Sequence, residues 1–130
     1  MSFLAATTES GDSAGEPSGV IDDFLKDVAA IQRSGHATEH SYRPALEKLF
    51  NSLADGVTAI NEPRREKIGA PDFVFRRGDI VIGHCEAKDL GVDVKKMKGP
   101  NEEQKKRYVG ALSNLVYTNC LDWIFYRDGE

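Results

Sequence analysis

Three residues in the middle of the chain, Asp72, Glu86 and Lys88, are of types that together could act on a phosphate. Carboxylates are hard oxygen ligands that suit Mg²⁺. A lysine beside such a metal can orient or deprotonate a water molecule, and it can stabilise the charge that grows on a phosphoryl group. These residue types therefore indicate metal-dependent chemistry on a phosphodiester, provided that the fold brings them together.

Two predicted strands must position these side chains. Residues 72–76 alternate in the way that is typical of a half-buried strand, and residues 80–87 give the strongest strand signal in the chain. Gly78 marks the turn of an antiparallel hairpin between them. Because alternate side chains share one face of a strand, we expect Glu86 and Lys88 on one side and Cys85 and Ala87 on the packed side.

The register of this hairpin decides whether the acids meet. Pairing centred on Gly78 sets Asp72 across from His84 and diagonal to Glu86, on one face. A turn centred on Arg77 and Gly78 instead puts Asp72 on the face opposite to Glu86. A shared metal site therefore requires an odd-length loop or a bulge.

A plainer interpretation is that Glu86-Ala87-Lys88 is an ordinary charged stretch on a solvated strand face, since this tripeptide alone demands no chemistry. The Pro-Asp pair at the head of the preceding strand favours the metal site. Zinc is not favoured, because no C-x-x-C or H-x-x-x-H spacing is present. Cys85 and Cys120 are expected to be buried free thiols, and His84 either lines the site or is structural.

The surrounding elements predict an α/β fold. Apolar spacing indicates a helix over residues 20–33 and a second one from Thr38 to Gly56, in which Pro44 means either a later start or a kink. A short strand over 57–60, a helix over 101–115 and a final strand over 123–127 complete the chain. The order is helix, helix, strand, strand, strand, helix, strand, which implies a mixed four-stranded sheet flanked by helices.

Charge and composition divide the chain. Residues 1–19 have the composition of a disordered tail, and residues 20–130 are long enough for one domain. The formal net charge is −4, but residues 1–30 carry six acids and one base, which leaves 16 bases and 15 acids in the remainder. No secretion signal and no run of 18 apolar residues is present, so we expect a cytoplasmic protein with no membrane partner.

Pro71-Asp72, then thirteen residues, then Glu86-Ala87-Lys88 resembles the signature of PD-(D/E)xK nucleases. The run Gln104 to Tyr108 on the following helix is similar to the QxxxY motif of a large subset of that superfamily. The resemblance implies a restriction-endonuclease-like core that hydrolyses DNA with Mg²⁺, for which Mn²⁺ can substitute. It implies that Asp72 and Glu86 bind the metal, that Lys88 positions the water, and that Gln104 assists; Tyr108 is expected mainly to pack.

A closer resemblance covers most of the chain from Gly35 onward. Residues 37–46, 61–63 and 69–72 look like the nuclease domain at the N-terminus of large bacterial restriction proteins. Those proteins fuse the nuclease to an adenine-specific DNA methyltransferase and a target-recognition domain, so the resemblance implies a fragment of a restriction-modification protein. It also implies a helix acid in the metal site, for which Glu39 matches best and Glu47 second. Glu62 is a further candidate contact.

Double-stranded DNA is the partner that this resemblance implies. A basic stretch after the hairpin could follow the DNA backbone, although such runs are usually solvated surface. The residues concerned are Lys95, Lys96, Lys98, Lys105 and Arg107. Two alternatives stay open: a nuclease-fold module that binds DNA or docks without catalysis, and an α/β protein with no role in nucleic-acid chemistry. The latter predicts affinity for neither metal nor DNA.

Overall fold

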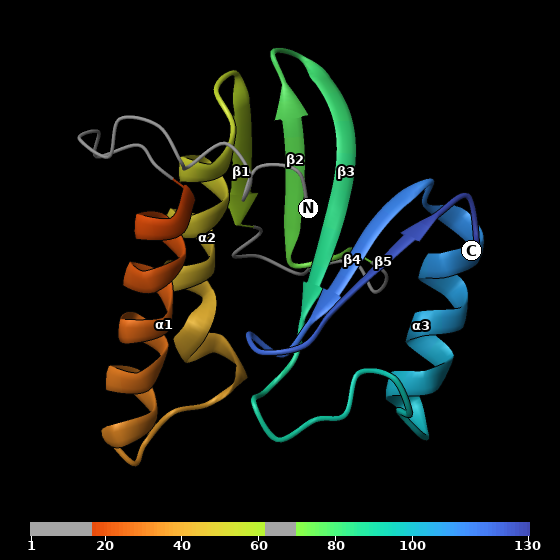
Figure 1. Cartoon of the computed structure of the whole chain (residues 1–130). Helices are drawn as coiled ribbons and strands as arrows, with labels where there is room; N and C mark the ends of the chain where they lie inside the picture. The colour runs from red at the N-terminus through yellow and green to blue at the C-terminus, as the bar shows by residue number, and fades with distance from the viewer. Residues whose placement is uncertain (1–16, 62–69) are drawn as a thin grey trace. The chain divides into compact units, whose positions relative to one another are not determined.

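The computed structural model describes residues 17–61 and 70–130. The chain divides into two compact units, Met1–Gly56 and Val57–Glu130. The described part of the first unit is helical, and the second is a sheet with one helix (Figure 1). The predicted α/β class is confirmed. The prediction of a disordered tail falls mostly outside the described residues, and Pro17–Gly19 form the first turn of a helix.

The first unit is a pair of packed helices. Helix α1 spans Pro17–Arg33, and helix α2 spans Arg43–Leu53. The apolar residues that share one side of each helix are buried, among them Phe24 and Val28 in α1 and Leu46 and Leu49 in α2. The helices contact each other along this apolar side, and the connection turns at Gly35, whose φ of 78° favours glycine.

Pro44 predicts either a later start of the second helix or a kink in its first turns, and the structure shows which is correct. A short 3-10 helix, η2, spans Glu39–Tyr42, and α2 begins only at Arg43. Pro44 thus lies in the first turn of α2, where its missing N–H breaks no helical hydrogen bond. Thr38 precedes η2, and its backbone N–H donates to the Ser41 hydroxyl at 2.9 Å. The later start of α2, rather than a kink, is therefore correct.

The second unit is built on a five-stranded mixed sheet in the order β1-β2-β3-β4-β5 (Figure 1). The strands are β1 Val57–Asn61, β2 Phe73–Arg77, β3 Ile80–Ala87, β4 Asn114–Thr118 and β5 Trp123–Arg127. Strands β3 and β4 are parallel, and the other neighbours are antiparallel. A parallel pair needs a crossover, which here contains helix α3, Pro100–Ala111.

The sheet has five strands instead of the predicted four, because β4 was assigned to the end of a helix. Leu112 and Leu115 continue the spacing of Tyr108, but α3 ends at Ala111 and Leu112 is already extended, with φ −114° and ψ 131°. The segment from Leu115 to Thr118 is almost wholly apolar or β-branched and is largely buried. Such a run is typical of a central parallel strand, and periodicity over so few residues does not distinguish it from a helix.

Helix α3 packs on one face of the sheet beside β4 and β5 (Figure 1). Tyr108 of α3 and Tyr117 of β4 meet with ring centroids 6.5 Å apart. They belong to a buried cluster with Val94, Met97 and Leu115. Since Tyr117 pairs with Glu86 across the β3–β4 ladder, this cluster lies on the same face of the sheet as Glu86.

The register of the β2–β3 hairpin differs from the predicted one. Val74 lies across from His84, and Phe73 lies across from Cys85, so the same register sets Asp72 opposite Glu86 itself instead of His84. The turn holds two residues, Gly78 and Asp79, and a register shift follows it. Ile82 is the extra residue of this bulge. The predicted requirement for a bulge is therefore confirmed, although the predicted centre of the hairpin is wrong.

Candidate metal and phosphodiester site

Asp72 and Glu86 hold each other in place across the β2–β3 hairpin. The backbone N–H of Asp72 donates to Glu86 Oε1 at 3.2 Å, and the backbone N–H of Ala87 donates to Asp72 Oδ2 at 2.9 Å. Each carboxylate thus accepts a main-chain hydrogen bond from the opposite segment. These main-chain donors hold both side chains in orientation.

Lys88 follows Glu86 by two residues and lies on the same side of the chain. Its ammonium Nζ lies 3.4 Å from Glu86 Oε2 and donates to Asn101 Oδ1 at 3.1 Å. Its backbone N–H donates to the Thr118 carbonyl at 2.8 Å, which extends the ladder with β4 beyond Ala87. The predicted shared side of Glu86 and Lys88 is consistent with the ion pair.

These charged groups are buried. The exposed fractions are 0% for Asp72, 1% for Glu86 and 5% for Lys88. Ionised side chains are almost never fully buried unless they are paired or bind metals. The plainer interpretation, in which Glu86-Ala87-Lys88 is a solvated strand face, is therefore wrong for this structure.

The donor set of Asp72 and Glu86 suits a divalent metal. A carboxylate oxygen of each residue lies within 4.8 Å of one on the other residue. Carboxylate oxygens are the ligands of Mg²⁺ and Mn²⁺, and Mg²⁺ commonly uses one or two carboxylates while it keeps several waters. The two residues present could hold such an ion without further protein ligands.

Tyr117 and Gln104 form a hydrogen bond beside these acids. The Tyr117 hydroxyl donates to Gln104 Oε1 at 3.1 Å. Burial raises the pKa of Tyr117, and the negative charge of Glu86 raises it further. The hydroxyl therefore stays protonated and remains a donor. Gln104, predicted to reach the lysine or a water, has the Tyr117 hydroxyl as a partner in this structure, and Tyr108 packs as expected.

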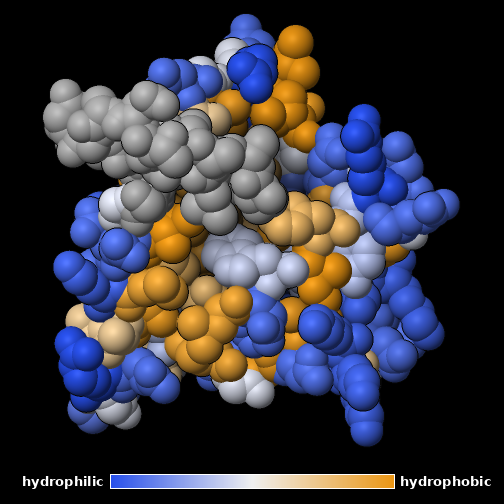
Figure 2. All heavy atoms as spheres, viewed as in Figure 1, coloured by the Kyte–Doolittle hydropathy of each residue, from blue (hydrophilic) through white to orange (hydrophobic). Residues whose placement is uncertain are grey.

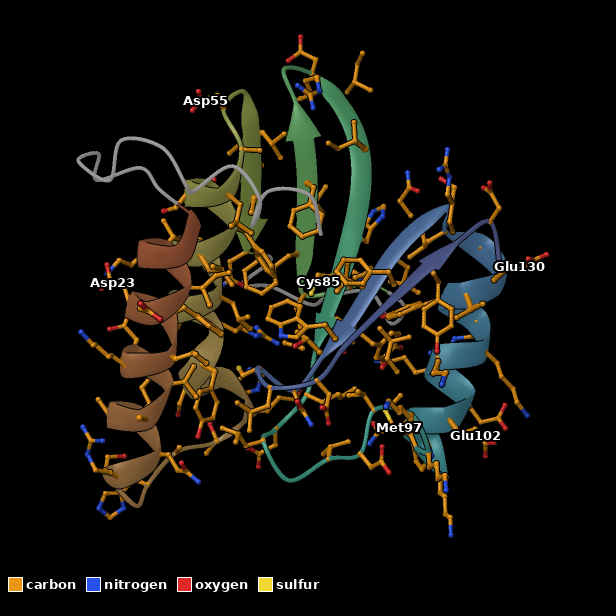
Figure 3. The ribbon with its side chains drawn as sticks, in the orientation of Figure 1. Asp23, Asp55, Cys85, Met97, Glu102 and Glu130 are labelled. Carbon is orange, nitrogen blue, oxygen red and sulfur yellow. The ribbon has the colours of Figure 1, made fainter. Side chains whose placement is uncertain are left out.

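Cys85 alternates with Glu86 along β3 and so lies on the other face of the sheet, and Cys120 follows β4. Both are buried and free, as predicted, and Figure 3 shows Cys85 in the middle of the sheet. Burial raises the pKa of the Cys85 thiol, with further contributions from the charges of Asp72 and Glu86. His84 is half-buried on the face of Glu86, and burial lowers its pKa, which favours the neutral imidazole.

The two candidate helix acids belong to the first unit. Glu39 opens η2, and Glu47 lies in the middle of α2; both side chains are half-buried. The backbone carbonyl of Glu47 accepts a hydrogen bond from the Asn51 side chain at 2.9 Å. Glu62, the third candidate acid, lies outside the described residues.

The predicted DNA-contacting residues lie on α3 and on the loop before it. Lys95, Lys96, Lys98 and Arg107 are exposed, and Figure 2 shows hydrophilic side chains gathered over this part of the second unit. Lys105 is half-buried, and its ammonium lies 5.5 Å from the centre of the Tyr126 ring. Four of the five side chains are thus accessible to a phosphate backbone.

Sequence reasoning missed Asn101 and Tyr117, which both contact predicted site residues. Asn101 carried no motif signal, and its contact with Lys88 depends on how α3 packs. Tyr117 lay in the stretch at the end of the predicted helix, whereas it belongs to the neighbour strand of β3. A correct assignment of β4 would have paired Tyr117 with the strand of Glu86.

The described structure is that of an α/β protein whose mixed sheet holds two buried carboxylates and a lysine at one place. No protein-family model and no curated protein matches the chain. Among solved structures, the chain is similar to one in the cryo-electron-microscopy structure of the DrdV–DNA complex, with a TM-score of 0.65 and 22% sequence identity. The match covers 85% of this chain and 80% of that chain, which shows a shared fold. Within residues 17–61 and 70–130, no helix is long and apolar enough to cross a membrane.

Proposed function

We propose that this chain is a metal-dependent DNA endonuclease domain of the PD-(D/E)xK type and that it works within a restriction-modification protein. The observation that carries the proposal is the buried constellation of Asp72, Glu86 and Lys88, in which each carboxylate accepts a main-chain hydrogen bond across the hairpin and the lysine lies 3.4 Å from Glu86. The shared fold with a chain of the DrdV–DNA complex supports DNA as the substrate.

Asp72 and Glu86 would hold Mg²⁺ in this proposal, and Glu39 is the helix acid that the resemblance to restriction nucleases assigns to the same metal. A bound divalent ion would polarise the scissile phosphate and make a coordinated water more acidic. The Lys88 ammonium orients the attacking water and stabilises the phosphoryl oxygens as negative charge grows on them. Hydrolysis forms a P–O bond to the water oxygen and breaks the P–O bond to a sugar oxygen, which takes up a proton. Gln104 assists from α3.

Double-stranded DNA is the proposed partner, and methyltransferase and target-recognition domains are proposed to be linked to this one. The basic residues of α3 and its preceding loop follow the phosphate backbone, which positions the duplex without reading sequence. Residues 20–130 are the proposed nuclease domain.

Nicking of supercoiled plasmid DNA in Mg²⁺ or Mn²⁺ tests the activity. The variants Asp72→Asn, Glu86→Gln and Lys88→Met keep the shape of each side chain and remove its charge. We expect each to lower the nicking rate about 100-fold or more, because each removes a metal ligand or a transition-state contact. Asp79→Asn, at the exposed turn of the same hairpin, is the matched control and should nick at the wild-type rate. DNA binding with no metal-dependent nicking would favour the non-catalytic module instead.

A further inference from the structure

Lys88 has the longest side chain of the three residues Asp72, Glu86 and Lys88. Its four-carbon stem has many rotamers, and a strand fixes only its Cα. The backbone hydrogen bond to the Thr118 carbonyl at 2.8 Å sets where the stem begins. The position of the ammonium therefore depends on the groups that it contacts at its far end.

Two contacts at that far end come from different elements. Glu86, two residues earlier on the strand, lies 3.4 Å from the ammonium, and Asn101 accepts a hydrogen bond from it at 3.1 Å. An ammonium has only donors, so the amide oxygen of Asn101 is the atom that faces it. Glu86 is also a proposed metal ligand, whereas Asn101 is neutral and holds Lys88 without adding a charge.

Asn101 is itself held firmly. It is the second residue of α3, after Gly99 with φ 64° and Pro100, which fix the start of the helix. The Tyr108–Tyr117 contact anchors the same helix to the sheet. Asparagine near a helix start usually caps backbone N–H groups, but here its side-chain oxygen is directed to Lys88.

We propose that Asn101 is a positioning residue. It holds the Lys88 ammonium at the position from which the ammonium can contact the scissile phosphate and the attacking water. The inference rests on the proposed function, and it assigns to the first turn of α3 a part in catalysis that none of the sequence motifs indicates. Asn101 touches no substrate; it acts through Lys88. Misplacement of a catalytic group by about 1 Å can slow a reaction 100-fold, so one such contact has a measurable effect.

Two variants of similar size separate this role from a merely structural one. Asn101→Leu removes the acceptor, and Asn101→Asp keeps an oxygen at the same place. We expect Asn101→Leu to lower kcat for Mn²⁺-dependent plasmid nicking about tenfold with KM for DNA nearly unchanged. Asn101→Asp should stay within about threefold of wild type. Glu102→Leu, at the exposed neighbour that projects from the start of α3 (Figure 3), is the control and should not change kcat.

Nuclear magnetic resonance of the Lys88 ¹⁵Nζ group gives a second readout that needs no activity. The ammonium should be ordered in the wild type and in Asn101→Asp, and mobile in Asn101→Leu. Wild-type kcat in Asn101→Leu, equal losses in both Asn101 variants, or an ammonium as ordered in Asn101→Leu as in the wild type would each overturn the inference. A wild-type chain that neither binds Mn²⁺ nor nicks DNA would overturn the proposed function, while the resonance would still decide whether Asn101 holds Lys88.

Discussion

At the scale of single residues, the candidate site consists of the buried charged side chains of Asp72, Glu86 and Lys88. Asp72 and Glu86 are oriented by backbone donors, which act whether or not a metal is bound, and Lys88 is oriented by side chains. An isosteric change of either acid to its amide keeps the shape of the side chain and removes its negative charge. Variants at this scale therefore distinguish metal ligation from packing.

The choice between Glu39 and Glu47 as the helix acid is a residue-scale prediction. Glu39→Gln should weaken Mn²⁺ binding about tenfold or more, because it removes the negative charge of a proposed carboxylate ligand. Glu47→Gln is the matched control, since it is also a half-buried acid of the first unit, and it should bind Mn²⁺ as the wild type does. Calorimetric titration measures both. The reverse pattern would move the assignment to Glu47, and wild-type affinity in both variants would exclude a third carboxylate from the first unit.

The burial of the two thiols predicts how fast they react with a disulfide reagent. Burial raises the pKa of Cys120 to about 12 from an ordinary value of 9.0. Only the thiolate is a nucleophile, so we expect Cys120 and Cys85 to react slowly with a disulfide reagent in the native protein at pH 8. Both should react rapidly in guanidinium chloride. Native thiols that react as fast as unfolded ones would contradict their burial.

The same shift makes the fold less stable in alkali. In the unfolded chain Cys120 loses its proton above about pH 9, whereas in the folded chain it keeps it until about pH 12. The unfolded state then binds fewer protons, so the stabilisation is complete below pH 9 and is lost as the pH rises toward 12. Urea unfolding at pH 8 and pH 10 should show a smaller loss in Cys120→Ala than in the wild type.

At the scale of elements, the β2–β3 hairpin brings the acids together only because of its bulge. The two-residue turn at Gly78 and Asp79 alone would set Asp72 on the face away from Glu86. Ile82 adds the residue that corrects the register, and the Asn114 side chain of β4 donates to the Ile82 carbonyl at 2.9 Å. Bulges commonly redirect a side chain near a functional site.

Deletion of Ile82 should therefore abolish Mn²⁺ binding, because the register beyond the turn shifts by one residue and turns Asp72 from Glu86. Insertion of one glycine between Gly78 and Asp79 in the deletion variant restores the number of residues between the acids. This compensated variant should recover binding within about tenfold of wild type. Calorimetric titration with circular dichroism checks binding and folding together. Wild-type affinity in the deletion variant would show that the bulge does not set the site.

The sequence predicts some elements of this fold correctly and others not. Strands β3 and β5 were predicted with their exact bounds, since their apolar and aromatic residues are bounded by turn residues. The sequence shows only that a shared site of Asp72 and Glu86 requires an odd-length loop or a bulge. It does not place the bulge at Ile82, because a register shift has no local sequence signal. The contact from Asn101 to Lys88 depends on the tertiary packing of α3, which residue spacing does not encode.

At the scale of the whole molecule, charge is distributed unevenly along the chain. The first 30 residues carry six acids and one base, a net charge of −5, and the rest carries 16 bases against 15 acids. An overall acidic protein can still bind DNA through a local basic surface. Lys95, Lys96, Lys98 and Arg107, which are exposed on α3 and its preceding loop, are assigned to that role.

The salt dependence of DNA binding tests this surface. Each neutralised phosphate contributes about −0.9 to the slope of log K against log salt for a duplex. Lys95→Gln with Lys96→Gln should therefore make the slope less steep by about 1.8 if both contact phosphates. Lys26→Gln with Arg33→Gln, exposed on α1, removes the same charge and should leave the slope unchanged. Fluorescence anisotropy measures both, and equal slopes in the two double variants would assign the bases to solvated surface.

Calorimetric titration of Mn²⁺ into the wild type and into Asp72→Asn tests the central claim most directly. The asparagine keeps an oxygen for the Ala87 N–H, so the hairpin is retained while one metal ligand loses its charge. We expect saturable binding in the wild type and an affinity at least about 100-fold weaker in Asp72→Asn. Asp79→Asn should bind as the wild type does. Equal binding by wild type and Asp72→Asn, or none by the wild type, would contradict a metal site at Asp72 and Glu86.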